Sequence, residues 1–315
     1  MSNRVAAVDC GTNSIRLLIA DVQPDGTLAD VHREMRIVRL GQGVDATGAF
    51  APEAIERTRV ALADYAAAMR EAKVDRVRMV ATSATRDASN REEFFGMARE
   101  LLGTVVPGAE AEVITGDEEA RLSFAGAIGE LAADEAPYVV VDLGGGSTEL
   151  VFGDADGVRA AFSADIGCVR ITERAMPGNP PTDEQVDAAT EFARERLADA
   201  FAAVPVEQAR TWVGVAGTMT TIAAVALELP EYDASKVHLS RLSLDQVYAV
   251  ADRLTSLDHD QRAALGPVHP GRVDVIGGGA VIVRALADEL SRRAGITELV
   301  VSEHDILDGI ALSIA

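Results

Sequence analysis

The spacing of apolar and polar residues along the chain predicts an alternation of strands and helices. Apolar residues three and four positions apart, as in residues 53–72, are typical of amphipathic helices, and strict alternation, as in residues 76–82, is typical of half-buried strands. Capping-box patterns at Thr115 and Thr182 mark two further helix starts. Strands are expected at 76–82, 111–115, 212–216 and 298–302, and helices at 53–72, 91–102, 116–132, 183–203, 219–229, 243–256, 280–293 and from 305. This alternation indicates an α/β fold.

An internal repeat links the two halves of the chain. Residues 7–21 and 140–154 align at a constant offset of 133 with several identities. Each copy has an apolar run, an Asp-x-Gly turn that ends in Ser, and a second apolar run, which predicts a hairpin whose turn uses Gly and Asn for positive φ. The identical pairs include Asp9/Asp142, Gly11/Gly144, Ser14/Ser147, Leu17/Leu150 and Asp21/Asp154. The repeat predicts two halves of similar fold whose Gly-rich turns face each other, with a boundary near 133–137.

The two Gly-rich turns are candidate phosphate-binding sites. Successive backbone N–H groups in such a turn form an anion-binding nest, and glycine permits close approach of a phosphate. The candidate residues are Gly11, Thr12, Asn13, Ser14 and Arg16 in the first copy, and Gly144, Gly145, Gly146, Ser147 and Thr148 in the second. The candidate Mg²⁺ ligands are Asp142 and Asp9, each at the end of the preceding strand, and Glu149, at the repeat position of Arg16.

Two further segments carry candidate catalytic groups. Glu118 and Glu119 fall in the first turn of the helix predicted from 116, where a carboxylate could orient a water molecule. Acidic residues there also favour the helix dipole, and helical spacing does not choose between the two, because both are expected to point away from the apolar stripe. Arg86 lies in a polar loop after a strand, where it could hold a phosphate bidentately or could simply be solvated.

Taken together, these motifs resemble the exopolyphosphatase/guanosine pentaphosphate phosphatase family, within the actin, sugar-kinase and Hsp70 ATPase superfamily. The resemblance runs over almost the whole chain, in its short two-domain form. The matching segments are VDCGTNSIRLLIAD (8–21), ATSATRDASN (81–90), VITGDEEARLSFAG (113–126), VVDLGGGSTELVFG (140–153), IGCVRITE (166–173) and AGTMTTIAA (216–224). The segment VSEHDILDGI (301–310) matches more loosely, since Leu307 stands where a basic residue is expected.

The resemblance implies two ribonuclease-H-like domains with mixed five-stranded sheets flanked by helices, and an active-site cleft between them. It implies domain I at 1–133, domain II at 134–303, and a last helix at 304–315 that packs back on domain I. It also implies that Glu119, immediately before Ala120, is the catalytic carboxylate, that Glu118 caps the helix with Thr115, and that Arg86 contacts phosphate.

The function that follows is release of terminal phosphate from inorganic polyphosphate by Mg²⁺-dependent in-line attack of water. Three alternatives stay open. Guanosine pentaphosphate could be the substrate. A polyphosphate or nucleotide kinase would need a nucleoside pocket, which IGGG at 276–279 could build. A non-catalytic actin-like filament or sensor protein would polymerise with nucleotide.

The amino-acid composition limits the classes of partner that the protein is expected to bind. The chain has 315 residues, 48% of them hydrophobic, which suffices for two globular domains. Acidic residues outnumber basic ones by 50 to 29, so we expect no nucleic-acid partner, and a polyanionic substrate must be held by local groups. The two cysteines, Cys10 and Cys168, fit no disulfide framework or metal motif. The lack of a signal peptide or an 18-residue apolar stretch predicts a cytoplasmic protein without a membrane partner, and a homodimer is left open.

Overall fold

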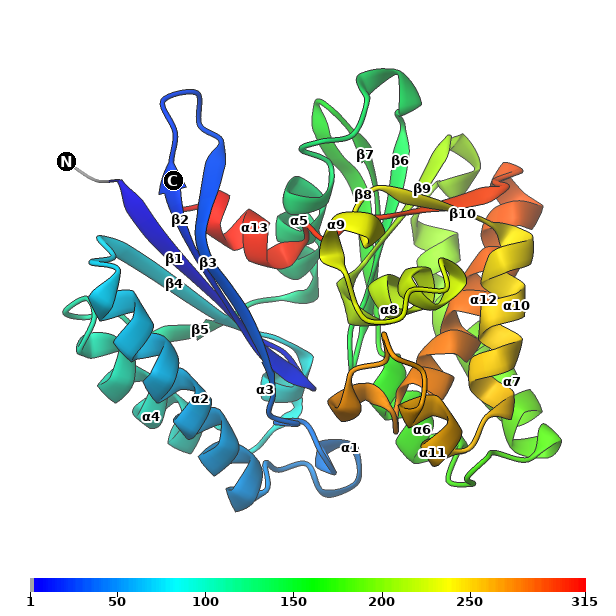
Figure 1. The fold of residues 1–315 in the computed structure, drawn as a ribbon, viewed down its shortest axis with the longest axis horizontal. Helices are drawn as coiled ribbons and strands as arrows, with labels where there is room; N and C mark the ends of the chain where they lie inside the picture. The colour runs from blue at the N-terminus through cyan, green and yellow to red at the C-terminus, as the bar shows by residue number, and fades with distance from the viewer. Residues whose placement is uncertain (1–2) are drawn as a thin grey trace. The chain divides into compact units, whose positions relative to one another are not determined.

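The computed structural model describes residues 3–315, which form two compact units. Unit 1 comprises the chain up to Gly126 together with Ile306–Ala315, and unit 2 comprises Ala127–Asp305. Each unit contains one mixed sheet with helices against it (Figure 1). The chain therefore crosses between the units twice, after Gly126 and after Asp305.

Unit 1 is built on a five-stranded sheet in the order β3-β2-β1-β4-β5. β1, β2 and β3 are antiparallel neighbours, whereas β4 and β5 are parallel to β1. The strands are β1 (Arg4–Cys10), β2 (Ser14–Val22), β3 (Leu28–Ile37), β4 (Arg76–Ala81) and β5 (Ala111–Val113). The helices are α1 (Val44–Thr47), α2 (Pro52–Glu71), α3 (Ser83–Asp87), α4 (Arg91–Gly103), α5 (Gly116–Ala127) and α13 (Ile306–Leu312).

Both faces of the unit 1 sheet are covered, which explains why β1 is apolar at nearly every position. Ala6 and Val8 belong to a core shared with α2 and α4. Val5 and Ala7 belong to a second core, which α5 and the last helix, α13, complete on the opposite face. Successive side chains of a strand point to opposite faces, so a strand buried on both faces shows no polar alternation.

Unit 2 has a six-stranded sheet in the order β10-β11-β9-β6-β7-β8. β6, β9 and β11 are parallel, and β7, β8 and β10 run antiparallel to their neighbours. The strands are β6 (Tyr138–Leu143), β7 (Thr148–Asp154), β8 (Gly157–Ala164), β9 (Thr211–Val215), β10 (Ser240–Ser243) and β11 (Glu298–Val301). The helices are α6 (Cys168–Ala175), α7 (Asp183–Ala203), α8 (Ala216–Ala226), α9 (Ala234–Val237), α10 (Leu244–Ser256), α11 (His259–Ala263) and α12 (Ile276–Ala294), with short 3₁₀ turns at Ala133–Glu135, Val206–Gln208 and Pro270–Arg272. The sixth strand, β10, is an addition to the five strands expected.

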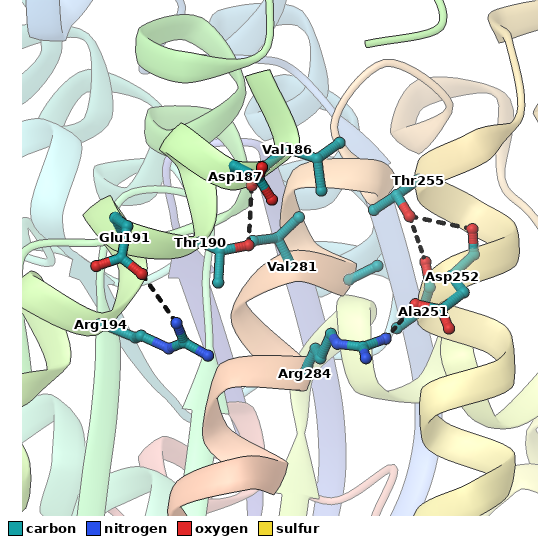
Figure 2. Close-up of a pocket in the computed structure, with 11 residues that line it drawn as sticks. Val186, Asp187, Thr190, Glu191, Arg194, Ala251, Asp252, Thr255, Val281 and Arg284 are labelled. Carbon is teal, nitrogen blue, oxygen red and sulfur yellow. Dashed lines mark hydrogen bonds and ion pairs between the residues drawn. The ribbon is translucent and has the colours of Figure 1, made fainter. Parts of the chain in front are cut away.

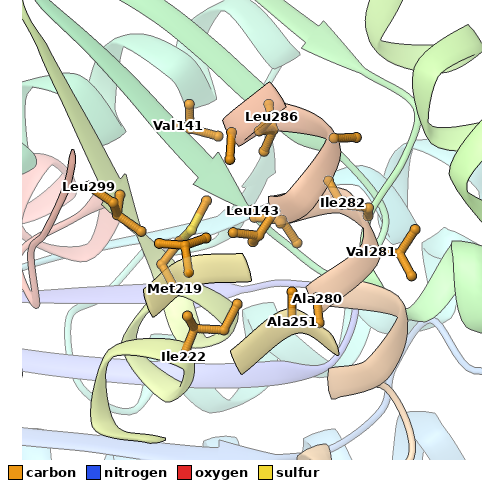
Figure 3. Close-up of a cluster of buried hydrophobic side chains, with 14 of the residues drawn as sticks. Val141, Leu143, Met219, Ile222, Ala251, Ala280, Val281, Ile282, Leu286 and Leu299 are labelled. Atoms are coloured by element: carbon orange, nitrogen blue, oxygen red, sulfur yellow. The ribbon is translucent and has the colours of Figure 1, made fainter. Parts of the chain in front are cut away.

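The main core of unit 2 lies between its sheet and helices α8, α10 and α12. Figure 3 shows Val141 and Leu143 of β6 and Leu299 of β11 packed with Met219 of α8 and Leu286 of α12. All five side chains are at most 1% exposed. This continuous apolar layer fixes the strand ends from which the candidate site is built.

Most predicted elements are confirmed, and the differences have physical reasons. The Thr182/Gln185 capping box is formed in full at the start of α7. β3, β8 and β10 escaped prediction: all three are edge strands, and β3 and β10 are also polar. α6 was missed because it is short. The polar loop predicted at 83–90 contains the helical turn α3, and α5 ends at Ala127 rather than near residue 132. Among the described residues, no helix combines the length and apolarity that a bilayer crossing requires.

Two helical glycines of unit 1 should respond in opposite ways to alanine. A Cβ at Gly309 in α13 would lie 1.9 Å from the Leu122 carbonyl oxygen of α5, whereas a Cβ at the exposed Gly96 in α4 would meet nothing within 4 Å. We expect Gly309→Ala to lower the free energy of unfolding by about 1–3 kcal/mol. Gly96→Ala should raise it by about 0.5–1 kcal/mol. Urea unfolding of both variants checks this, and equal midpoints would contradict the packing described for α13.

Candidate active site

The two Gly-rich turns of the repeat have the same backbone hydrogen bonding. The Gly11 N–H donates to the Ser14 carbonyl at 3.0 Å, and the Gly144 N–H donates to the Ser147 carbonyl at 3.0 Å. Each bond closes an antiparallel hairpin, β1–β2 in unit 1 and β6–β7 in unit 2. The sequence repeat is therefore a structural repeat.

The expected use of positive φ in these turns is wrong. Positive φ angles are found at other described residues, among them Gly26 and Gly157 in the β2–β3 and β7–β8 connections. In the second turn, glycine serves close approach instead: a Cβ at Gly144 would lie 3.3 Å from the Ser147 carbonyl oxygen. In the first turn, a Cβ at Gly11 would lie 3.6 Å from the Ser14 carbonyl oxygen, which is an ordinary contact distance.

In unit 1 the strand-end carboxylate faces an arginine. Asp9 and Arg16 are cross-strand partners, and Arg16 Nη2 and Nε lie 2.7 and 2.9 Å from Asp9 Oδ2. Asp9 is 5% exposed, so this ion pair is largely withdrawn from solvent. Arg16, predicted to bind phosphate, thus compensates the charge of Asp9, predicted to bind metal.

In unit 2 the equivalent position holds a second carboxylate. Asp142 and Glu149 are cross-strand partners and are 6% and 1% exposed. Ser163 Oγ donates a hydrogen bond of 2.7 Å to Glu149 Oε1. Two buried carboxylates directly opposite each other repel when both are ionised, and a divalent cation relieves that repulsion. Carboxylate oxygens are the ligands that Mg²⁺ prefers, so this pair fits such an ion.

The hydroxyl side chains of the two turns are held by neighbouring segments. Thr12 Oγ1 lies 3.0 Å from Ser83 Oγ, which ties the first turn to the start of α3. Thr148 Oγ1 donates to the Ile166 carbonyl at 2.6 Å, so this hydroxyl proton is committed within the protein.

Glu119 and Arg86 come together at the carboxyl ends of β4 and β5. Arg86 Nη1, at the end of α3, donates to Glu119 Oε2 at 2.8 Å and to the Ile114 carbonyl at 3.0 Å. Glu119 is 7% exposed, so the expectation that it points away from the packed side of its helix is wrong. Glu119 is buried where its side chain bonds to Arg86, and the spacing of residues along the helix cannot predict such a contact.

Glu118 has a different environment. Its N–H donates to Thr115 Oγ1 at 3.2 Å, so Thr115 caps the helix as predicted. Its carboxylate, however, accepts a hydrogen bond from Arg78 Nη2 at 2.6 Å on a partly exposed surface instead of closing the capping box. Of the two adjacent glutamates, only Glu119 is buried.

Arg272 is a charged residue at the strand ends of unit 2 that sequence reasoning missed. Its guanidinium lies against Gly217, where an added Cβ would fall 1.0 Å from Arg272 Nη1. Gly217 and Thr218 lie in the first turn of α8, which begins at Ala216 with a positive φ of 70°. Arg272 is 55 residues away in sequence, and no motif marks it.

His238 and His304 come together with Glu130 in unit 2. His238 Nε2 lies 3.1 Å from Glu130 Oε2, and His304 Nδ1 lies 3.5 Å from Glu130 Oε1. The Glu303 N–H donates to His238 Nδ1 at 3.2 Å, which places the proton of the neutral ring on Nε2. That tautomer donates to Glu130 and favours a hydrogen-bonded cluster over a metal centre.

A groove of about 550 Å³ crosses helices α7, α10 and α12 in unit 2 (Figure 2). Its polar side chains are paired locally: Arg194 with Glu191, Arg284 with Asp252, and Thr255 with its own helix carbonyls. None of the sequence-predicted site residues lines it. The groove is therefore a feature of helix packing, separate from the Gly-rich turns.

Neither cysteine has the features of a reactive thiol. Burial raises the pKa of the Cys10 thiol far above its ordinary value, with the nearby Asp9 charge adding to the effect. Burial also raises the pKa of the Cys168 thiol. A thiol whose thiolate is disfavoured is a weak nucleophile and a weak metal ligand.

Comparisons of the sequence and of the structure with known proteins all lead to the same family. A sequence profile of the Ppx/GppA phosphatase family matches residues 18–314. Exopolyphosphatase 2 of Mycobacterium tuberculosis is 62% identical over 315 residues, covering 99% of this chain and 98% of the relative. A crystal structure described as an exopolyphosphatase-like protein aligns with a TM-score of 0.93 at 46% identity, over 99% of this chain and 97% of that one. The Aquifex aeolicus member of the Ppx/GppA family aligns with a TM-score of 0.79 at 35% identity, over 98% and 96%.

Proposed function

The chain belongs to the Ppx/GppA phosphatase family, and from that premise we propose that it is an exopolyphosphatase, a hydrolase that removes the terminal phosphate of inorganic polyphosphate. The assignment of roles depends on one observation. Glu119 is a buried carboxylate whose Oε2 accepts a hydrogen bond of 2.8 Å from Arg86 Nη1 at the carboxyl edge of a sheet. The curated relative at 62% identity supports polyphosphate over guanosine pentaphosphate as the substrate.

In the proposed reaction, Glu119 takes the proton of the attacking water. The water oxygen bonds to the terminal phosphorus, the bridging P–O bond breaks, and the products are orthophosphate and a chain one phosphate shorter. A positioned general base is effective when it lies within hydrogen-bond reach of the proton it accepts. The Arg86 bond holds the Glu119 carboxylate in one orientation, as this role requires.

Arg86 is proposed to bind phosphate as well as to orient Glu119. Its bonds to Glu119 and Ile114 both use Nη1, which leaves Nε and Nη2 as donors for a phosphate oxygen. The backbone N–H groups of 11–14 and 144–147 are proposed to hold the other phosphates, because such nests neutralise anions without a charged side chain. The domain cleft expected from the sequence stays a prediction.

Asp142 and Glu149 are the proposed direct Mg²⁺ ligands. Asp9 is proposed to act through water, because Arg16 already compensates its charge. When bound, Mg²⁺ would spread the charge of the phosphate oxygens.

The kinase alternative rested on the segment IGGG at 276–279, and the structure gives these glycines another role. The glycines of IGGG allow α12 to pack closely: a Cβ at Gly278 would lie 2.3 Å from Thr172 Oγ1, and one at Gly279 would lie 2.6 Å from Thr218 Cγ2. Helix packing therefore accounts for this motif without a nucleotide.

Substrate choice is tested by phosphate release with Mg²⁺ from short polyphosphate, long polyphosphate and guanosine pentaphosphate, in parallel with ADP phosphorylation by polyphosphate. We expect release from polyphosphate and no ATP. ATP formation would replace the proposed function with the kinase. The cytoplasmic location and the homodimer stay predictions.

Replacing Glu119 should remove most of the activity. Glu119→Gln keeps the side-chain shape but deletes the base, and we expect kcat to fall about 10²–10⁴-fold with an unchanged unfolding transition. Glu118→Gln is the matched control, because Glu118 is not buried and bonds to Arg78 instead of Arg86, and it should stay near wild-type activity. If Glu118→Gln is inactive and Glu119→Gln is not, the base has been assigned to the wrong glutamate.

Removing a carboxylate of the Asp142–Glu149 pair should weaken metal binding. Asp142→Asn and Glu149→Gln are each expected to raise the Mg²⁺ concentration for half-maximal activity at least about tenfold. Mn²⁺ binding, followed by electron paramagnetic resonance, should weaken in parallel. Asp154→Asn, which removes a carboxylate from the other end of β7, is the control. Full activity of the wild type in excess chelator would rule out the metal.

A further inference from the structure

The start of α6 binds three successive carbonyl groups of the second Gly-rich turn. The Cys168 N–H donates to the Gly144 carbonyl at 3.0 Å, and the Val169 and Arg170 N–H groups donate to the Gly145 carbonyl at 2.9 and 3.2 Å. Arg170 also donates through its side chain, from Nε to the Gly146 carbonyl at 2.9 Å. We call residues 167–170 the carbonyl clamp.

Holding these carbonyls fixes the direction of the N–H groups that follow them. A trans peptide is planar, so a carbonyl and the next N–H point in opposite directions. With the carbonyls of Gly144, Gly145 and Gly146 directed at α6, the N–H groups of residues 145–147 are directed away from it. These are the N–H groups proposed to bind phosphate.

Gly167 permits this close contact. A Cβ at Gly167 would lie 2.4 Å from Gly145 C and 2.5 Å from Gly146 N, which is backbone against backbone. The Gly167 backbone is extended, with φ −151°, a conformation open to any residue. The position therefore needs glycine because a side chain would not fit.

The first turn is held in the same way by a different segment. The Gly41 N–H donates to the Thr12 carbonyl at 2.8 Å, and the Val38 and Arg39 N–H groups donate to the Asn13 carbonyl at 3.0 and 2.9 Å. In each unit the holding segment follows the third strand of the hairpin meander, β3 or β8. In unit 1 these bonds come from the backbone, whereas in unit 2 a side chain, Arg170, takes part.

We propose that Arg170 is a positioning residue that keeps the Gly144–Ser147 turn in its phosphate-binding conformation through the bond from its Nε to Gly146. The inference rests on the proposed function of that turn. A nest that is already ordered binds its anion without first losing backbone entropy, so loss of this bond should affect binding and turnover together.

Two substitutions separate the hydrogen bond from the charge. Glutamine places an amide N–H₂ where arginine has Nε, whereas methionine places a methyl group there, and both remove the charge. We expect Arg170→Met to lower kcat/KM for tripolyphosphate about tenfold to a hundredfold, as small misplacements of binding groups do. Arg170→Gln should stay close to the wild type. Arg174→Met, one turn along α6 at an exposed position, is the matched control.

Hydrogen exchange gives a readout that does not depend on turnover. In the unliganded protein, the amides of residues 145–147 should exchange faster in Arg170→Met than in Arg170→Gln or the wild type, with other unit 2 amides unchanged. A role of Arg170 in global stability alone would instead raise exchange throughout unit 2, and that result would overturn the proposal.

The remaining outcomes are also decisive. If Arg170→Gln is as impaired as Arg170→Met, the arginine acts through its charge and the proposal is wrong. If both variants match the wild type while Glu119→Gln is inactive, the positioning role fails and the proposed function stands. If the wild type releases no phosphate from tripolyphosphate, the proposed function fails, and the exchange data alone decide whether Arg170 orders the turn.

Discussion

One short backbone hydrogen bond, made once in each unit, organises the two Gly-rich turns. It runs from the glycine N–H of each Asp-x-Gly turn to the carbonyl of the serine three residues later, at 3.0 Å in both copies. By closing the hairpin, it sets the register that places Asp9 opposite Arg16 and Asp142 opposite Glu149. The apolar strands on either side hold that register, because a slip of one residue would turn every core side chain to the wrong face.

The two copies share a backbone but differ in charge. At the position seven residues after the aspartate, unit 1 has an arginine and unit 2 a glutamate. The first pair is an internal ion pair, and the second is a pair of buried carboxylates suited to a cation. The same backbone arrangement therefore carries an internally neutralised ion pair in unit 1 and, in the function proposed above, a metal-binding pair of carboxylates in unit 2.

The sequence predicted what depends on local pattern and missed what depends on distant contacts. The repeat, the buried strands and the Thr182/Gln185 cap are local, and each is present in the structure. The edge strands β3 and β10 were missed because they are polar. Burial of Glu119 under Arg86 could not be seen in the helical spacing, and the positions of Arg272 and Arg170 depend on contacts with glycines 55 and 24 residues away. Only the resemblance to a family singled out Glu119 from its neighbour.

The central claim is that the two turns hold the phosphates while Glu119 faces the water and Asp142 and Glu149 hold the metal. A crystal structure with Mg²⁺ and a non-hydrolysable imido analogue of tripolyphosphate tests it most directly. The account predicts analogue oxygens on the N–H groups of 145–147, the cation on oxygens of Asp142 and Glu149, and a water within hydrogen-bond reach of Glu119. An analogue bound away from both turns, or a cation that leaves both of these carboxylates untouched, would contradict it.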